Sequence, residues 1–127
     1  LRAETRASHA AGLFDQSLEL IAMSEDVGRH NALDKAVGKA FIARDLDKVR
    51  VGVLSSRLSF EMVQKAARAR IPILVGMSRP TVLAVQLAAD VEMTIACDNK
   101  KGGLSVYGGF GRIVKRGESS QTDRQNR

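Results

Sequence analysis

Residues 24–35 read SEDVGRHNALDK, a polar run that joins an apolar segment to an amphipathic one. Two acids, an arginine, a histidine and an asparagine fall within seven residues of this run. A connecting turn does not need Glu25, Arg29 or His30. Because α/β folds bind ligands where strands lead into helices, we interpret these side chains as part of a site. A solvated loop that binds nothing is the alternative interpretation.

The same run predicts the start of a helix. Gly28 can turn the chain, Asn31 is a good N-cap, and Asp34 stands three positions later as a short capping-box partner. Apolar residues then recur at the spacing of one helical face, namely Leu33, Ala36, Val37, Ala40 and Phe41.

Strands and helices alternate along the rest of the chain. Upstream, His9–Phe14 and Leu18–Met23 read as the two strands of a hairpin. Downstream, we predict strands at Val49–Leu54, Ile71–Gly76, Val91–Cys97 and Leu104–Tyr107, a helix from Ser59 to Arg70, and a helix from Pro80 to Asp90 with Ser78 or Thr81 as its cap. The last helix is apolar almost all round, so we predict that it is the most buried of the three.

Three units share one pattern: an apolar strand, a polar loop that contains an arginine, and a helix start. The loops hold Arg29, Arg57 and Arg79, with Ser56 and Ser78 beside two of them. Right-handed crossovers between parallel strands place such loops at one edge of the sheet. Helix N-termini and guanidinium groups that meet there favour a phosphate-bearing ligand.

Interpretations in which these residues have only a structural role also stay open. Arg29 could pair with Asp26, and Arg57 with Glu61, which would leave solvated helix caps and no site. His9 and His30 could form an acid–base pair, since both titrate near neutral pH, or could be hydrogen-bonded structural residues. Cys97 lies near lysines that could lower its pKa, or it could be a small buried apolar residue.

The composition indicates one globular domain. The chain has 127 residues, of which 44% are hydrophobic, and a formal net charge of +6. Five basic and two acidic residues fall in residues 112–127, so we predict a disordered basic tail there and a folded domain over residues 1–111. A sequence pI near 10.0 is compatible with an anionic partner. The aromatic content of 4% is too low for a base-stacking platform, which argues against nucleic acid.

Cysteine usage and hydropathy bear on the compartment. A single cysteine, Cys97, excludes an internal disulfide and a zinc site built on several thiolates. We therefore expect a reducing compartment, the cytoplasm. Neither a signal peptide nor an apolar run of about 18 residues is recognisable, so we expect no membrane span. The chain opens at Leu1, which we interpret as the start of a processed product or a fragment.

Residues 25–35, EDVGRHNALDK, resemble the formate dehydrogenase accessory sulfurtransferase family in order and spacing. Shorter matching segments are residues 9–11, 61–67, 71–75, 80–81 and 83–85, so the likeness covers about residues 8–107. The resemblance implies an α/β fold of the cytidine-deaminase-like type, a three-layer α/β/α sandwich with a mixed sheet, usually as a homodimer.

The resemblance also implies a function. Proteins of this family take sulfur from a cysteine desulfurase and pass it to the molybdenum cofactor in its bis-molybdopterin guanine dinucleotide form, which is their bound substrate. Formate dehydrogenase then receives the sulfurated cofactor. In the family, the segment before the last strand contributes to cofactor binding, and here that segment is Asp98 to Gly103.

We therefore predict a set of cofactor-binding residues and no metal ligand. The set is Arg29, His30, Ser56, Arg57, Ser78, Arg79, Asp98, Asn99, Lys100, Lys101, Gly102 and Gly103. We expect GDP to bind there as a surrogate for half of the cofactor.

The sequence departs from the family at two places. The family carries sulfur on a cysteine of a Cys-x-x-Cys loop, and no such pair occurs here. We therefore name no catalytic residue and expect cofactor binding without transfer. The family's Arg-Gly-Gly-Arg-like stretch is replaced by Lys100-Lys101-Gly102-Gly103, which keeps charge but loses the arginine fork.

Two further hypotheses stay open. One is a deaminase-type zinc hydrolase, which would need a His/Cys/Cys metal set and a nearby glutamate. The other is a non-catalytic domain that binds an anion, a nucleotide or a protein partner, with the basic tail as part of its surface.

Overall fold

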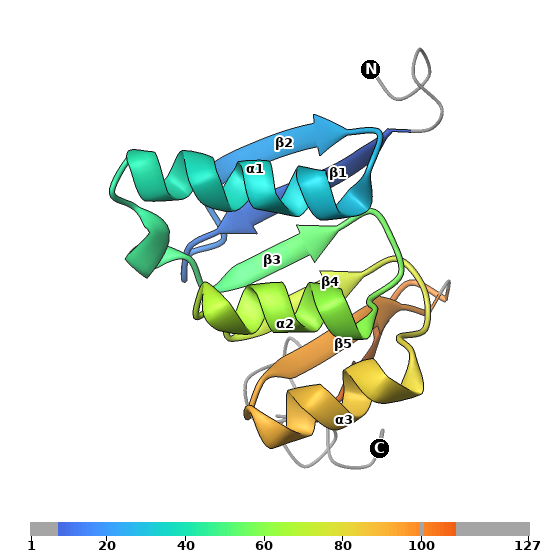
Figure 1. Cartoon of the computed structure of the whole chain (residues 1–127). Helices are drawn as coiled ribbons and strands as arrows, with labels where there is room; N and C mark the ends of the chain where they lie inside the picture. The colour runs from blue at the N-terminus through green and yellow to red at the C-terminus, as the bar shows by residue number, and fades with distance from the viewer. Residues whose placement is uncertain (1–7, 100, 109–127) are drawn as a thin grey trace.

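The computed structural model describes residues 8–99 and 101–108. They form one mixed sheet with helices packed against a face of it (Figure 1). The strands are β1 (His9–Phe14), β2 (Leu20–Asp26), β3 (Val51–Leu54), β4 (Ile73–Gly76), β5 (Thr94–Asp98) and β6 (Leu104–Tyr107). The helices are α1 (Arg29–Ile42), α2 (Phe60–Arg68) and α3 (Val82–Asp90), with a 3-10 turn η1 at Leu46–Lys48.

The order of the strands decides where their ends meet. The sheet runs β2-β1-β3-β4-β5-β6. β3, β4 and β5 are parallel, β1 is antiparallel to both β2 and β3, and β6 is antiparallel to β5. β2 therefore points the same way as β3, β4 and β5. These strands end at one side of the sheet, at Asp26, Leu54, Gly76 and Asp98, which we call the C-terminal edge.

The predicted α/β class and mixed sheet are confirmed, but the predicted layering is not what the described residues show. The steps from β2 to β3, from β3 to β4 and from β4 to β5 all cross the sheet in the same direction. Right-handed crossovers then put α1, α2 and α3 on the same face (Figure 1). The described part is thus a two-layer arrangement, and a third, cytidine-deaminase-like layer has no counterpart in residues 8–99 and 101–108.

The core lies between the helices and the sheet. Alternate strand residues face it, and Leu13, Leu54, Leu74 and Ile95 are at most 1% exposed. The helices add Leu33, Met62, Val63, Ala84 and Ala88, all fully buried. This packing anchors the loops at the C-terminal edge.

Most predicted elements are present with shifted bounds. His9–Phe14 and Leu104–Tyr107 are strands with the predicted limits. The second strand begins two residues later than predicted, at Leu20, because the preceding residues form a turn. There, Asp15 Oδ1 accepts hydrogen bonds from Ser17 N at 2.9 Å and Glu19 N at 3.0 Å.

α3 is not the most buried helix, and this prediction was wrong. Ala84 and Ala88 are its buried residues, whereas Val82 and Leu83 are 73% and 60% exposed. α3 packs over β5 and beside α2 near one end of the sheet, so a single stripe of small side chains faces the core. Val85 and Leu87 pack partly against the core, whereas Val82 and Leu83 stay exposed to solvent.

Candidate functional site

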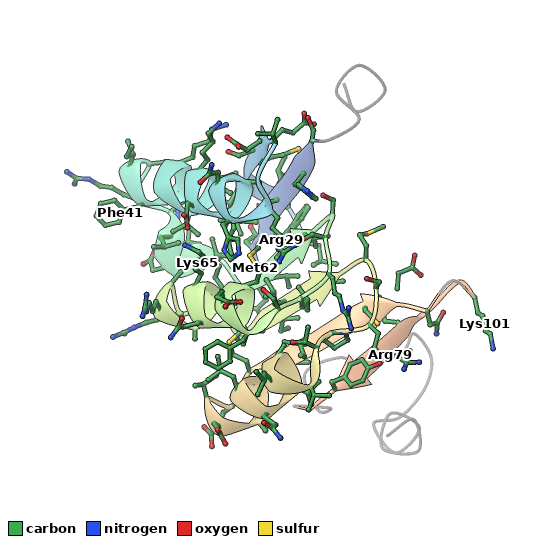
Figure 2. All side chains as sticks on the ribbon, turned by 45° about the vertical axis from the view of Figure 1, so that its right-hand side comes forward. Arg29, Phe41, Met62, Lys65, Arg79 and Lys101 are labelled. Carbon is green, nitrogen blue, oxygen red and sulfur yellow. The ribbon has the colours of Figure 1, made fainter. Side chains whose placement is uncertain are left out.

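The C-terminal edge brings the three arginine loops to one side of the molecule, as predicted. The loop after β2 leads to Arg29 and His30, the loop after β3 holds Ser56 and Arg57, and the loop after β4 holds Ser78 and Arg79. Figure 2 shows Arg79 and Lys101 at the end of the molecule away from Phe41. Three separate crossovers therefore deliver guanidinium groups to the same edge.

Two of these loops are joined to each other by the backbone. Two hydrogen bonds of 3.1 Å connect them, from Met77 N to Ser56 O and from Thr81 N to Leu58 O. Because these bonds start where β3 and β4 end, they extend the parallel pairing beyond the sheet. The loops after β3 and β4 thus form one rigid unit.

Arg57 and Arg79 meet within this unit. Arg57 Nε donates a hydrogen bond to the carbonyl oxygen of Arg79 at 2.7 Å. This bond uses the inner nitrogen of the guanidinium group, and no contact of its terminal nitrogens is seen among the described residues. The side chain is exposed. Arg57 is therefore held in place, and its fork stays available for an oxyanion.

Asp26 organises the loop between β2 and α1. Its carboxylate pairs with Lys35 Nζ at 2.7 Å and accepts hydrogen bonds from Gly28 N at 3.0 Å and Asn31 Nδ2 at 3.4 Å. These contacts, Lys35 foremost and Gly28 next, lower the pKa of Asp26 to about 2. Asp26 is thus engaged by Lys35, and the alternative in which it pairs with Arg29 is wrong.

The predicted cap of α1 was also wrong. α1 begins at Arg29, so Asn31 lies inside its first turn, and Gly28 at the N-cap has no side chain to accept a hydrogen bond. Arg29 and His30 therefore place basic side chains at the positive end of the helix dipole, where an anion is favoured. The first turn of α1 contains no acidic residue, and the carboxylate nearest to its start is that of Asp26, which accepts a hydrogen bond from Gly28 N at the N-cap.

The other two helices are capped by their own side chains. Ser59 Oγ accepts a hydrogen bond from Met62 N at 3.4 Å, as predicted. Thr81 Oγ1 accepts one from Ala84 N at 3.1 Å, so Thr81 and not Ser78 caps α3. Ser78 is half-buried in the loop after β4, and capping does not account for it.

The arginines of the edge have no described counter-ion. Within residues 8–99 and 101–108, no carboxylate lies within 4.0 Å of a guanidinium nitrogen of Arg29, Arg57 or Arg79. Glu61 in particular does not pair with Arg57, contrary to the second alternative. Three arginines that have no carboxylate partner in the described part of the chain make this edge attractive to an anionic ligand.

The loop after β5 is shaped by Asn99. Asn99 Oδ1 accepts hydrogen bonds from Lys101 N at 2.8 Å and Gly103 N at 3.2 Å, and Asn99 N donates to Gly103 O at 3.0 Å. Gly102 has φ +85°, a conformation that favours glycine. The side-chain oxygen Oδ1 of Asn99 is thus used inside the loop, while Lys101, Gly102 and Gly103 are exposed.

Asp98 and Lys100 are the remaining residues predicted to bind the cofactor. Asp98 ends β5 at the C-terminal edge and is half-buried. Lys100 lies outside the described residues. The loop after β5 therefore contributes to the edge, with its contacts to a ligand still a prediction.

The other candidates lie close to the same edge. His9 begins β1 opposite Asp26 in the sheet register, and His30 lies in the first turn of α1. Cys97 is only 3% exposed, which favours its interpretation as a buried apolar residue. Burial and the neighbouring Cys97 thiol raise the pKa of Tyr107, whereas Arg79 acts in the opposite direction.

Sequence reasoning missed Lys35 and Tyr107. Lys35 was part of the quoted run, but its partner Asp26 lies nine residues earlier, and only the turn from β2 into α1 brings the two together. Tyr107 reaches the neighbourhood of Arg79 because β6 returns antiparallel beside β5. No local sequence signal marks either contact.

The described residues contain neither a metal-binding cluster nor a membrane-spanning helix. No three His, Cys, Asp or Glu side chains gather closely enough there to hold a metal ion. None of the described helices combines the length and the apolar character needed to cross a bilayer.

Fold and site define this chain as an α/β protein whose parallel strands end at a cationic edge of paired loops. Its sequence matches the model of the FdhD/NarQ family over residues 1–114. The chain therefore belongs to the FdhD/NarQ family, and the resemblance seen in the sequence is confirmed.

Relatives and a solved structure agree with this assignment. The chain is 44% identical over 118 residues to the sulfur carrier protein FdhD of Streptomyces coelicolor, which covers 92% of this chain and 42% of that protein. It is 50% identical over 91 residues to the sulfur carrier protein FdhD of Bordetella parapertussis, which covers 72% of this chain and 33% of that protein.

The crystal structure of a protein from Desulfotalea psychrophila, assigned as a formate dehydrogenase accessory protein, has a TM-score of 0.80 and 31% identity. It matches 89% of this chain and 48% of its own. This chain thus spans less than half of the length of these relatives.

Proposed function

We propose that this chain is the cofactor-binding part of a formate dehydrogenase accessory protein. Its C-terminal edge would bind the molybdenum cofactor, in the bis-molybdopterin guanine dinucleotide form, as a substrate. The names of the relatives, a sulfur carrier protein and a formate dehydrogenase accessory protein, support this role. The pyrophosphates of a guanine dinucleotide are the kind of anion that such an edge holds.

One observation carries the proposal. Arg57 is fixed against the backbone of Arg79 at 2.7 Å, on two loops that hydrogen-bond to each other. The guanidinium group of Arg57 is therefore preorganised for an anionic ligand, and Arg57 loses little side-chain entropy when the ligand binds. The uncapped start of α1 adds backbone N–H groups beside Arg29.

Sulfur transfer needs a reactive thiolate, and this chain offers none that is exposed. Its single cysteine, Cys97, is 3% exposed. A persulfide donor would have to reach a buried sulfur atom, so we assign no transfer step to Cys97. Within the proposal, these residues bind and orient the cofactor.

The proposal extends to partners and compartment. A cysteine desulfurase would supply sulfur and formate dehydrogenase would receive the cofactor, with the protein acting as a homodimer in the cytoplasm. The second candidate function is a non-catalytic anion- or nucleotide-binding domain, which the same cationic edge supports. Ligand selectivity separates the two.

Calorimetric titration of the full chain with GDP tests the proposal. We expect saturable binding, and we expect Arg57→Gln and Arg79→Gln each to weaken it by about tenfold, because each removes a charge-assisted hydrogen bond. Arg68→Gln is the matched control, since Arg68 lies in the last turn of α2, away from this edge, and its GDP affinity should equal that of the wild type.

Three outcomes distinguish the hypotheses. Tighter binding of GDP than of ADP supports the guanine dinucleotide. Equal binding of GDP, ADP and pyrophosphate supports the non-selective anion-binding domain instead. Folded protein that gives no heat with GDP at about 1 mM, a weak-binding concentration, contradicts both.

A further inference from the structure

The opposite end of the helical layer carries apolar surface that the fold leaves uncovered. Phe41 and Ile42, in the last turn of α1, are 69% and 82% exposed. Phe41 belongs to the apolar stripe of α1, and we predicted that it faces the core. That prediction was wrong because α1 extends past the end of the sheet, so its last turn has no strand beneath it (Figure 1).

Two hollows adjoin this exposed surface. One, of about 510 Å³, is lined by Phe41, Ile42 and Leu46 with Arg44 and Asp47. The other, of about 320 Å³, lies between α1 and α2 and is lined by Val37, Leu46 and Ala69 with Asp34, Lys65 and Arg68. Leu46 of η1 borders both. We call the two together the α1–α2 groove.

The charges of the groove are unequal. Lys65 Nζ lies 3.1 Å from both carboxylate oxygens of Asp34, so these two neutralise each other and brace α1 against α2. Arg44 and Arg68 form no ion pair with a carboxylate in the described part of the chain. Asp47 is the remaining acid of the lining. The lining of the groove therefore combines apolar side chains with three basic and two acidic ones, a net charge of +1.

We infer that the α1–α2 groove is a docking site for an amphipathic helix of a protein partner. Val37 and Phe41 are one helical turn apart, so they present apolar contacts at the spacing of a facing helix. Arg44 and Arg68, which have no carboxylate partner in the described part of the chain, favour a partner with carboxylates beside those apolar side chains. The partner helix thus carries leucine-like residues at i and i+4, flanked by Asp or Glu.

The position of the groove permits two ligands at once. The 14 residues of α1 separate its N-terminus at the C-terminal edge from Phe41 by roughly 20 Å. We expect a partner that contacts Phe41 and the lining of the groove to leave Arg57 and Arg79, on the loops after β3 and β4, accessible. This inference does not depend on the proposed cofactor, and its failure leaves GDP binding untouched.

A selection experiment tests the inference without a known partner. The full chain is immobilised and offered a displayed library of amphipathic helices of about 16 residues, long enough to hold helical structure when bound. Helices that also bind the Phe41→Asn variant are removed. We expect the enriched helices to carry apolar residues at i and i+4 with an excess of Asp and Glu.

Purified variants then locate the binding of an enriched helix. We expect Phe41→Asn and the pair Arg44→Glu with Arg68→Glu each to weaken it by about tenfold or more. Leu83→Asn is the matched control, because Leu83 is 60% exposed on α3 and away from the groove, and binding should not change. Far-UV circular dichroism spectra and urea midpoints that match the wild type show that these variants fold.

Three results would overturn the inference. One is no enrichment over the Phe41→Asn variant, and another is enrichment of basic or uncharged helices. The third is a chain that self-associates in light scattering and becomes monomeric with Phe41→Asn, which would show a second copy on this surface instead of an acidic helix.

Discussion

Asp26 holds the junction between β2 and α1 through its contacts with Lys35, Gly28 and Asn31. Its pKa in the folded chain is about 2, below the ordinary value of 3.8. A carboxyl group whose pKa is lowered by folding stabilises the protein at pH values above its unfolded pKa. That contribution is lost as the pH falls through 3.8 toward 2.

We therefore expect Asp26→Asn to destabilise the chain at pH 7 and to cost progressively less between about pH 5 and pH 2. Urea unfolding followed by circular dichroism at several pH values measures this difference. Asp47→Asn is the control, because Asp47 forms no ion pair in the described part of the chain. A cost of Asp26→Asn that stays constant with pH would show that the charge of Asp26 is not the cause.

Ser24 presents the reverse case, a polar atom without a partner. Its hydroxyl is buried on β2, 5% exposed, with no hydrogen-bond partner in the described structure. We expect Ser24→Ala to raise the free energy of unfolding by about 1 kcal/mol, because it removes an unsatisfied buried group. A higher urea midpoint with an unchanged slope would confirm this. Ser56→Ala should gain nothing, because Ser56 Oγ donates to Arg57 O at 3.4 Å, and lower stability of Ser24→Ala would contradict the prediction.

Between elements, Gly76 allows the loops after β3 and β4 to approach each other. A Cβ atom on Gly76 would lie 2.7 Å from Leu58 Cγ and 2.9 Å from Ser56 O. Neither neighbour is the far end of a flexible side chain. The close approach of these loops therefore depends on glycine at the end of β4.

We expect Gly76→Ala to lower the free energy of unfolding by about 1–3 kcal/mol. We also expect it to weaken GDP binding, because the loops that carry Arg57 and Arg79 must move apart. Gly38→Ala is the matched control on α1, where a Cβ would meet nothing within 4 Å. That control should gain about 0.5–1 kcal/mol from helix propensity. Native stability and GDP affinity in Gly76→Ala would show that the loops tolerate separation.

The elements also show how far periodicity reaches. The spacing on α1 correctly placed Leu33, Ala36 and Ala40 in the core. It failed at Phe41, because a helical face is buried only where another element lies opposite. The apolar surface of α3 failed as a guide to burial for the same reason.

At the scale of the whole molecule, two surfaces lie at opposite ends of the helical layer, and the arginines of both lack a carboxylate partner among the described residues. The C-terminal edge collects Arg29, Arg57 and Arg79 because successive crossovers run in the same direction. The α1–α2 groove exposes apolar residues because the last turn of α1 extends beyond the end of the sheet. The proposed cofactor and the inferred partner helix therefore occupy separate places on one rigid core.

The sequence by itself determined the alternation of strands and helices, the common edge of the arginine loops, and the family. The alternation follows from the hydrophobic periodicity, the common edge follows from the general right-handedness of crossovers, and the family follows from the run at residues 25–35. Only the tertiary structure decided that the described helices share one face, that Asp26 takes Lys35, and that Arg57 takes the backbone of Arg79. These outcomes depend on contacts between segments that are brought together only by folding, and local sequence patterns do not predict such contacts.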